Sequence, residues 1–296
     1  LSAEVYAAAS LVHNPGYMGS RQYDADFAGR TPLAGQLAAR AASKLRLSRF
    51  SEVEGRRFAV NLGFSIYDVV FSPDGKRLAV AGDDGKIRLM DADTGRVQRV
   101  LRGHGKSVGA LAWSPGGKLL ASAGRDFKIR LWRVADGKQL QVYSGHKRAI
   151  FGLDFARDGR RIASGSMDGH IGVWQVDGSR QLWIEAHKGE VKDVAFSPDG
   201  KQIASAGSDR AVRLWNVADG RKVGMFTGYH GAATKLAYSP DGRYLASVSR
   251  DATVRVHELG TKRLLFVFRE KDAGYLDTTF WAQHERLLAA QTDGLL

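Results

Sequence analysis

One short stretch recurs along this 296-residue chain about every 42 residues, and this regularity constrains the fold more than any single residue does. Its marker is a turn in which Ser or Ala is followed by two turn-forming positions and then by Gly. The five copies are Ser72-Pro73-Asp74-Gly75, Ser114-Pro115-Gly116-Gly117, Ala156-Arg157-Asp158-Gly159, Ser197-Pro198-Asp199-Gly200 and Ser239-Pro240-Asp241-Gly242. One further step leads to Phe280 and Trp281, where we expect a degenerate sixth copy. A period of this length is typical of a solenoid, a propeller or an array.

Each copy predicts four short strands and no helix. In the second copy, apolar runs begin near Val108, Leu119, Ile129 and Leu140, and each run has the length of a strand. The breaks between the runs carry Asp-Gly, Gly-Gly or Pro-Asp-Gly, which are turn sequences. Four antiparallel strands in a repeat of this size make one propeller blade. The sequence therefore predicts an all-β fold.

Composition sets limits on the class of protein. The chain is 44% hydrophobic and 25% charged, has no Cys, and lacks a run of about 20 apolar residues that a membrane span needs. The absence of Cys and of a signal segment predicts a cytoplasmic location. The start at Leu1 without Met suggests a processed product or a piece of a longer protein. A net charge of +13 favours an anionic partner, but the cations are spread through every repeat. Nucleic acid, which needs a contiguous basic face, is therefore not favoured.

A repeated set of polar residues resembles the signature of the WD-repeat (WD40) β-propeller family. Gly-His precedes the first strand, Ser lies in the second, Asp lies in the next turn and Trp ends the third. The Trp-Asp pair itself is degenerate, as in Leu131-Trp132-Arg133. The resemblance covers about residues 64 to 293. It implies a propeller that holds other macromolecules.

The same resemblance implies that these residues form a buried structural network and not a catalytic site. A hydrolase needs one exposed nucleophile, whereas this set occurs once per blade. The predicted network residues are His104, Ser122, Asp126, Trp132, His146, Ser164, Asp168, Trp174, His187, Ser205, Asp209, Trp215, His230, Ser247 and Asp251, with His257 at the last Trp position. Arg88, Arg130, Arg213 and Arg255 also recur at one strand position, which suggests an ion pair between blades or stem packing.

The terminal copies indicate how the ring closes. The sixth copy stops after its second strand, and residues 44–62 resemble the third and fourth strands of a blade. Residues 44–62 would then complete the blade begun by residues 276–293, giving a six-bladed propeller over residues 44–296. If the chain is truncated, seven blades are expected. Residues 1–43 lie outside the repeat and read as a linker or docking arm.

Partners of this family usually meet the loops between blades and the turns after the second strand. Carried onto this sequence, the candidate rim residues are Tyr67, Asp83, Arg125, Phe151, Met167, Lys192 and Arg250. Aromatic and Arg side chains are the residues that interface hot spots favour. We expect a non-catalytic scaffold that binds a protein or peptide with an acidic element and needs no cofactor or metal. The alternatives are a regulatory or sensor domain of a larger enzyme or signalling protein, within a larger complex or chain, and a nucleic-acid or anionic-surface binder.

Overall fold

The computed structural model describes residues 64–269 in full. It also describes the backbone of two later strands, β21 (Tyr275–Trp281) and β22 (Arg286–Gln291). The described residues are all-β and contain no helix, as the sequence predicts. The expected extension at residues 1–43 and the expected closing strands at residues 44–62 lie outside the described residues.

Five four-stranded antiparallel sheets follow one another along the chain, and each is one blade. Blades 1 and 2 comprise β1 (Ile66–Phe71), β2 (Arg77–Gly82), β3 (Lys86–Asp91), β4 (Val97–Arg102), β5 (Val108–Trp113), β6 (Leu119–Gly124), β7 (Ile129–Arg133) and β8 (Gln139–Tyr143). Blades 3 and 4 comprise β9 (Ile150–Phe155), β10 (Arg161–Ser166), β11 (His170–Gln175), β12 (Arg180–Glu185), β13 (Val191–Phe196), β14 (Gln202–Gly207), β15 (Val212–Asn216) and β16 (Lys222–Phe226). Blade 5 comprises β17 (Ala233–Tyr238), β18 (Tyr244–Ser249), β19 (Thr253–Glu258) and β20 (Arg263–Arg269).

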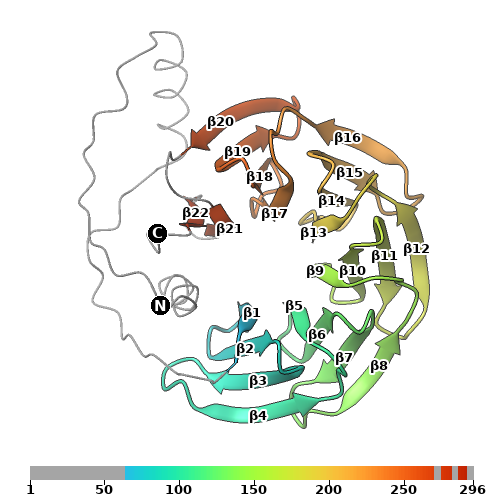
Figure 1. Ribbon diagram of the computed structural model, residues 1–296, viewed down its shortest axis with the longest axis vertical. Coiled ribbons are helices and arrows are strands. Elements are labelled where there is room, and N and C mark those ends of the chain that lie inside the picture. Colours follow the sequence, from blue (N-terminus) through green and yellow to red (C-terminus); the bar gives the residue numbers. More distant parts are fainter. Residues whose placement is uncertain (1–63, 270–274, 282–285, 292–296) are drawn as a thin grey trace.

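The blades are arranged radially about a common centre (Figure 1). The first strand of each blade is innermost and the fourth is outermost, because every sheet keeps its strands in chain order. The two-stranded sheet β21–β22 packs beside blade 5 through β17 and β18. This radial stacking of sheets defines a β-propeller.

The repeated marker sequence forms the turn between the first and second strands. In blade 1, Gly75 has a φ of 70°, and its N–H donates to the Ser72 carbonyl at 2.8 Å. A residue with a Cβ adopts this left-handed conformation only at a cost, so Gly is favoured there. The Ser72 hydroxyl donates to the Asp74 carboxylate at 2.6 Å, which holds the turn closed.

The apolar core lies between neighbouring blades. Leu89 of blade 1, for example, belongs to one buried cluster with Trp113 and Leu120 of blade 2. The indole N–H of Trp113 also donates to the Val70 carbonyl of blade 1 at 3.2 Å. Because each apolar face is covered by the next blade, the loops at the two ends of each sheet stay open to solvent.

Carboxylates join the innermost strands of successive blades. Asp68 accepts the Leu111 N–H at 2.7 Å, Asp154 accepts the Phe196 N–H at 2.7 Å, and Asp193 accepts the Leu236 N–H at 2.9 Å, each from the following blade. Burial raises the pKa of Asp154 to about 7, and the nearby Asp193 charge adds to this effect. These bonds fix the relative positions of the inner strands that carry the candidate site.

Candidate functional site

Every innermost strand of the five blades contains one extra residue at its start, a β-bulge. In blade 1, Ile66 pairs with Gly82 and Asp68 pairs with Ala81, so Tyr67 has no partner across the sheet. The bulged residues of blades 1 to 5 are Tyr67, Gly109, Phe151, Lys192 and Thr234. A bulge bends its strand and redirects the side chain of the extra residue. Three candidate rim residues, Tyr67, Phe151 and Lys192, therefore occupy equivalent, redirected positions.

In each blade a backbone hydrogen bond joins the turn after the second strand to the start of the first strand. The N–H of the residue before the turn Asp donates to the carbonyl of the residue two positions before the bulge. The five pairs are Asp83 to Ser65, Arg125 to Ser107, Met167 to Ala149, Ser208 to Glu190 and Arg250 to Ala232, at 2.9 to 3.0 Å. The bulge and this bond together form one local motif in each blade. In blade 1 this motif contains Tyr67 and Asp83, and in blade 3 it contains Phe151 and Met167.

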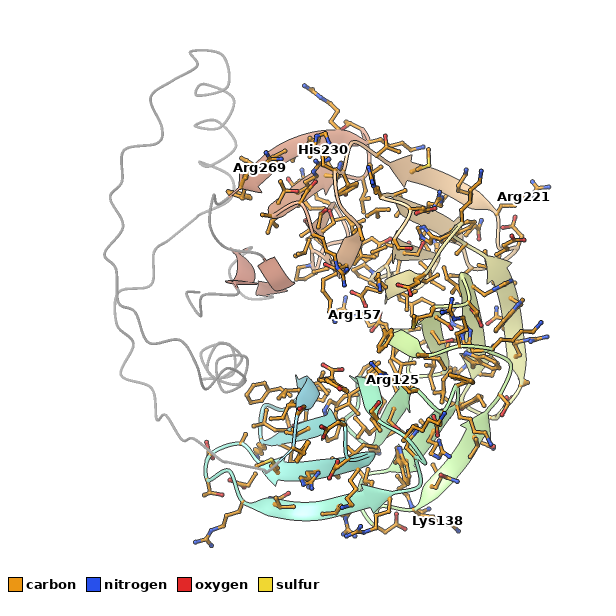
Figure 2. The ribbon with its side chains drawn as sticks, in the orientation of Figure 1. Arg125, Lys138, Arg157, Arg221, His230 and Arg269 are labelled. Carbon is orange, nitrogen blue, oxygen red and sulfur yellow. The ribbon has the colours of Figure 1, made fainter. Side chains whose placement is uncertain are left out.

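The rim side chains differ in how far they reach into solvent. Tyr67 is 48% exposed, and Arg125 is also exposed. Phe151 is half-buried and lies against Gly109 of blade 2, where an added Cβ would meet the Phe ring at 2.9 Å. Gly109 therefore makes the space that this aromatic ring occupies. Figure 2 shows Arg125 toward the centre of the ring, whereas Lys138 and Arg221 lie at its outer edge.

The remaining rim residues are only partly available to a partner. Asp83 is exposed and accepts the Ser65 N–H at 3.1 Å, and Arg250 is exposed. Met167 is half-buried, and Lys192 is half-buried in an ion pair with Glu190. Tyr67, Arg125, Phe151 and Arg250 are thus the rim side chains that offer an aromatic ring or an unpaired cation.

Blades 2, 3 and 4 each contain the same chain of hydrogen bonds beneath this rim. In blade 2, the Trp132 indole N–H donates to Ser122 Oγ at 2.8 Å. His104 Nε2 lies 2.8 Å from Ser122 Oγ, and His104 Nδ1 lies 3.0 Å from both oxygens of Asp126. The equivalent contacts join Trp174, Ser164, His146 and Asp168 in blade 3, and Trp215, Ser205, His187 and Asp209 in blade 4.

The chemistry of these groups determines the direction of the hydrogen bonds. An indole N–H can only donate, so Ser122 Oγ accepts from Trp132; because the Asp126 carboxylate accepts from His104 Nδ1, Nε2 is left to accept the Ser122 hydrogen. His104 Nδ1 then carries the ring proton and donates it to Asp126. Burial would raise the pKa of Asp126, but His104 and Arg130 outweigh it and hold this pKa at about 2. The three serines are fully buried with their hydroxyls engaged, so none of them is an exposed nucleophile.

Blade 5 departs from the predicted network, and His230 was wrongly assigned to it. His230 is exposed, and only its backbone N–H reaches Asp251, at 2.8 Å. The buried partner of Ser247 is Tyr229, whose hydroxyl lies 2.7 Å from Ser247 Oγ. The correct signal was spacing, because the His or Tyr precedes the Ser by 18 residues in blades 2 to 5. His257 is buried at the Trp position and stacks on Phe226.

The recurring arginines form ion pairs within a blade, not between blades as one expectation held. Arg88 pairs with Asp84 at 2.7 Å, Arg130 with Asp126 at 2.5 Å, Arg213 with Asp209 at 2.8 Å and Arg255 with Asp251 at 3.5 Å. In each pair the Asp begins the turn after the second strand and the Arg lies four residues later, in the third strand. In these four blades, 1, 2, 4 and 5, an Arg of the third strand thus pairs with the turn Asp.

The described part of the chain contains neither a metal-binding cluster nor a membrane-spanning helix. No group of three or more His, Asp and Glu side chains in it is arranged to hold a metal ion. None of its segments is a helix with the length and hydropathy needed to cross a membrane.

Four-stranded blades, a bulged inner strand and a buried network in successive blades define a β-propeller and support one of the WD-repeat type. The model of one protein family, described as the IFT122 first beta-propeller, matches residues 65–296. The chain belongs to this family. No curated protein sequence matches it. A propeller domain of this kind fits a role as a protein-interaction scaffold in general.

Proposed function

We propose that this chain is a non-catalytic WD-repeat scaffold that binds a partner protein or peptide at the rim formed by Tyr67, Arg125 and Phe151. The observation that carries the proposal is the inner-strand bulge, which redirects the side chains of Tyr67 in blade 1 and Phe151 in blade 3. In blades 1 and 3 the redirected side chain is aromatic. Rigid aromatic rings beside an Arg are the composition that binding hot spots favour.

The rim is pre-organised for binding. The backbone bond from Arg125 to Ser107 fixes the main chain at Arg125, and packing on Gly109 restrains the Phe151 ring before a partner arrives. Less conformational freedom is then lost on association. In blades 2 and 3 the Trp–Ser–His network also anchors the loops that carry Arg125 and Phe151.

A place within a larger assembly accords with this proposal. The family is described as the first propeller of a protein, which suits a chain that works beside other domains. A regulatory domain of a larger protein would use the same rim and differs only in what the bound partner controls.

The experiment compares two double variants of the whole chain in partner capture from cells that express it, with mass spectrometry of the captured proteins. The rim variant is Arg125→Glu with Phe151→Ala. The control is Lys138→Glu with Leu140→Ala, which also replaces one exposed cation and one exposed apolar residue, but on the outer side of blade 2. We expect the rim variant to lose partners that the control retains, with both melting temperatures measured.

Truncating the half-buried Phe151 could weaken folding, so Tyr67→Ala provides a second test with an exposed side chain. The proposal is rejected if the rim variant and Tyr67→Ala both recover the same partners as the control. It is also rejected if partner loss occurs only in proteins whose melting temperature has fallen.

A further inference from the structure

Exposed cations gather on the end of the blades that carries the rim. This upper face comprises the loops before each first strand and the turns after each second strand. Its exposed cations include Lys106, Arg125, Lys128, Arg148, Arg210 and Arg250. None of these six side chains forms an ion pair within the described part of the chain, since every described ion pair involves other residues. Their positive charge is therefore available to a partner.

In blades 2 to 4 the buried network holds the turn carboxylates of the upper face inward, whereas Asp83 of blade 1 is exposed. Asp126 bonds to His104 and Arg130, Asp168 bonds to His146, and Asp209 bonds to His187 and Arg213. These three carboxylates therefore already have partners and do not pair with the exposed cations. The network that stabilises these three blades also leaves the face above them positive.

The opposite, lower face also carries exposed cations, among them Lys118, Lys138 and Arg160. Its turns follow the first and third strands, and exposed aspartates accompany its cations there. These exposed aspartates are Asp74, Asp93, Asp136, Asp158, Asp177, Asp199, Asp219 and Asp241. Arg133 pairs with Asp136, and Arg161 pairs with Asp158. The two faces therefore differ in whether exposed carboxylates lie among the exposed cations.

Two large side chains on the upper face are held in left-handed backbone conformations without being buried. Phe127 has a φ of 65° and Arg210 a φ of 62°, and Phe127 is 39% exposed. Blades 1 and 3 have Gly85 and Gly169 at this turn position, where an added Cβ would meet a carbonyl of the next loop at 2.9 or 2.8 Å. At the same turn position, blade 2 has Phe127 and blade 4 has Arg210, and both side chains are exposed and not packed in the core. Strained residues held in solvent are a feature of binding sites.

Phe127 and its neighbours form one aromatic and cationic patch. The Lys106 ammonium lies 5.8 Å from the centre of the Phe127 ring, and Lys128 follows it in the chain. Arg148 lies on the next loop of the same face, before blade 3. An aromatic ring flanked by cations can contact the apolar part of a ligand while the cations pair with its anionic groups.

We propose that the upper face of blades 2 to 4 binds an acidic segment of a partner protein, with Phe127 and the cations Lys106, Lys128, Arg148 and Arg210 as contacts outside the rim. The inference rests on the proposed scaffold function and specifies the chemistry of the partner. A peptide is favoured over nucleic acid because the cations lie on separate loops, and the turn aspartates of the network lie close to them. A nucleic-acid track combines a continuous basic groove with several stacking platforms.

The test uses the whole chain and a fluorescent oligoglutamate peptide in anisotropy titrations, with oligothymidylate and phosphatidylserine vesicles as competing probes. The upper variant is Lys106→Glu, Lys128→Glu and Arg148→Glu, which touches no rim residue. The control is Lys118→Glu, Lys138→Glu and Arg160→Glu on the lower face of the same two blades. Both variants change the net charge by the same amount. Phe127→Gly removes the aromatic ring and relieves the strained backbone.

We expect the upper variant to weaken oligoglutamate binding by about tenfold or more, and the control by far less. Phe127→Gly should also weaken it, with a melting temperature that is unchanged or raised. Equal losses in the two charge variants, or no oligoglutamate binding at low salt, overturn the proposal. Tighter binding of oligothymidylate or vesicles than of oligoglutamate overturns it in favour of that partner. If only this test fails while the rim variants still lose partners, the scaffold function stands.

Discussion

Replacing Ser164 by Ala tests whether the repeated polar set is a structural network. Ser164 is fully buried, and its Oγ lies 2.8 Å from both Trp174 Nε1 and His146 Nε2. The substitution leaves two buried polar groups without their partner. Because each such group costs about 1–3 kcal/mol, we expect the free energy of unfolding to fall by about 2–6 kcal/mol. This corresponds to a decrease of roughly 5–15 °C in melting temperature for a domain of this size.

The assay is urea denaturation followed by tryptophan fluorescence, with thermal melts as a check. Ser179→Ala is the matched control, because Ser179 is an exposed Ser of the same blade. This variant should change stability by less than about 0.5 kcal/mol. A second background, Trp174→Phe, removes the indole N–H that Ser164 would otherwise satisfy. The cost of Ser164→Ala should then be smaller by about 1 kcal/mol, which a double-mutant cycle measures.

Two results would refute this reasoning. One is a destabilisation by Ser164→Ala no larger than that of Ser179→Ala, which would mean that the buried hydrogen bonds contribute nothing. The other is full additivity with Trp174→Phe, which would assign the cost to some contact other than the Ser–Trp bond.

Two further predictions concern blade 5 and the inner strands. Tyr229→Phe removes the hydroxyl that bonds Ser247 and should destabilise the protein by about 1–3 kcal/mol. His230→Ala should leave urea denaturation unchanged, because only the backbone of His230 bonds Asp251. A larger loss of stability in His230→Ala than in Tyr229→Phe would restore the original assignment of His230. Because the folded-state pKa of Asp154 is about 7 and the unfolded value about 3.9, the folded state binds more protons between these values, and stability falls as the pH rises through this interval. Asp154→Asn keeps a carbonyl acceptor for the Phe196 N–H. The melting temperature of this variant should depend less on pH between 4 and 7, and it should exceed that of the unsubstituted protein at pH 8. Thermal melts with an unchanged pH profile would contradict the assigned pKa.

Prediction from the sequence worked best where local chemistry repeats. The Ser-Pro-Asp-Gly turns, the four strands per repeat and the Trp–Ser–His–Asp contacts of blades 2 to 4 are all present. Each depends on residues close in sequence or at a constant spacing, so comparison of the copies was sufficient. The error at His230 has the same origin, because residue type was given priority over the 18-residue spacing that points to Tyr229.

Contacts between elements could not be predicted in the same way. The sequence singled out Tyr67 and Phe151, but only strand pairing shows that both are bulged residues and that Gly109 accommodates the Phe151 ring. It also noted the recurring arginines, yet their pairing with the turn aspartates depends on how the third strand lies beneath the turn. The sequence did not single out Phe127, because the residue type Phe predicts neither a left-handed backbone conformation nor an exposed side chain.

The sequence by itself determined a propeller of repeated four-stranded sheets. The period, the apolar alternation and the turn residues are local properties, and they recur in each repeat. Only the tertiary structure decided which charges of each face are paired. Pairing depends on contacts between elements: Asp126, for example, is held by Arg130 and His104, 4 and 22 residues away, while the aspartates of the opposite turns remain exposed.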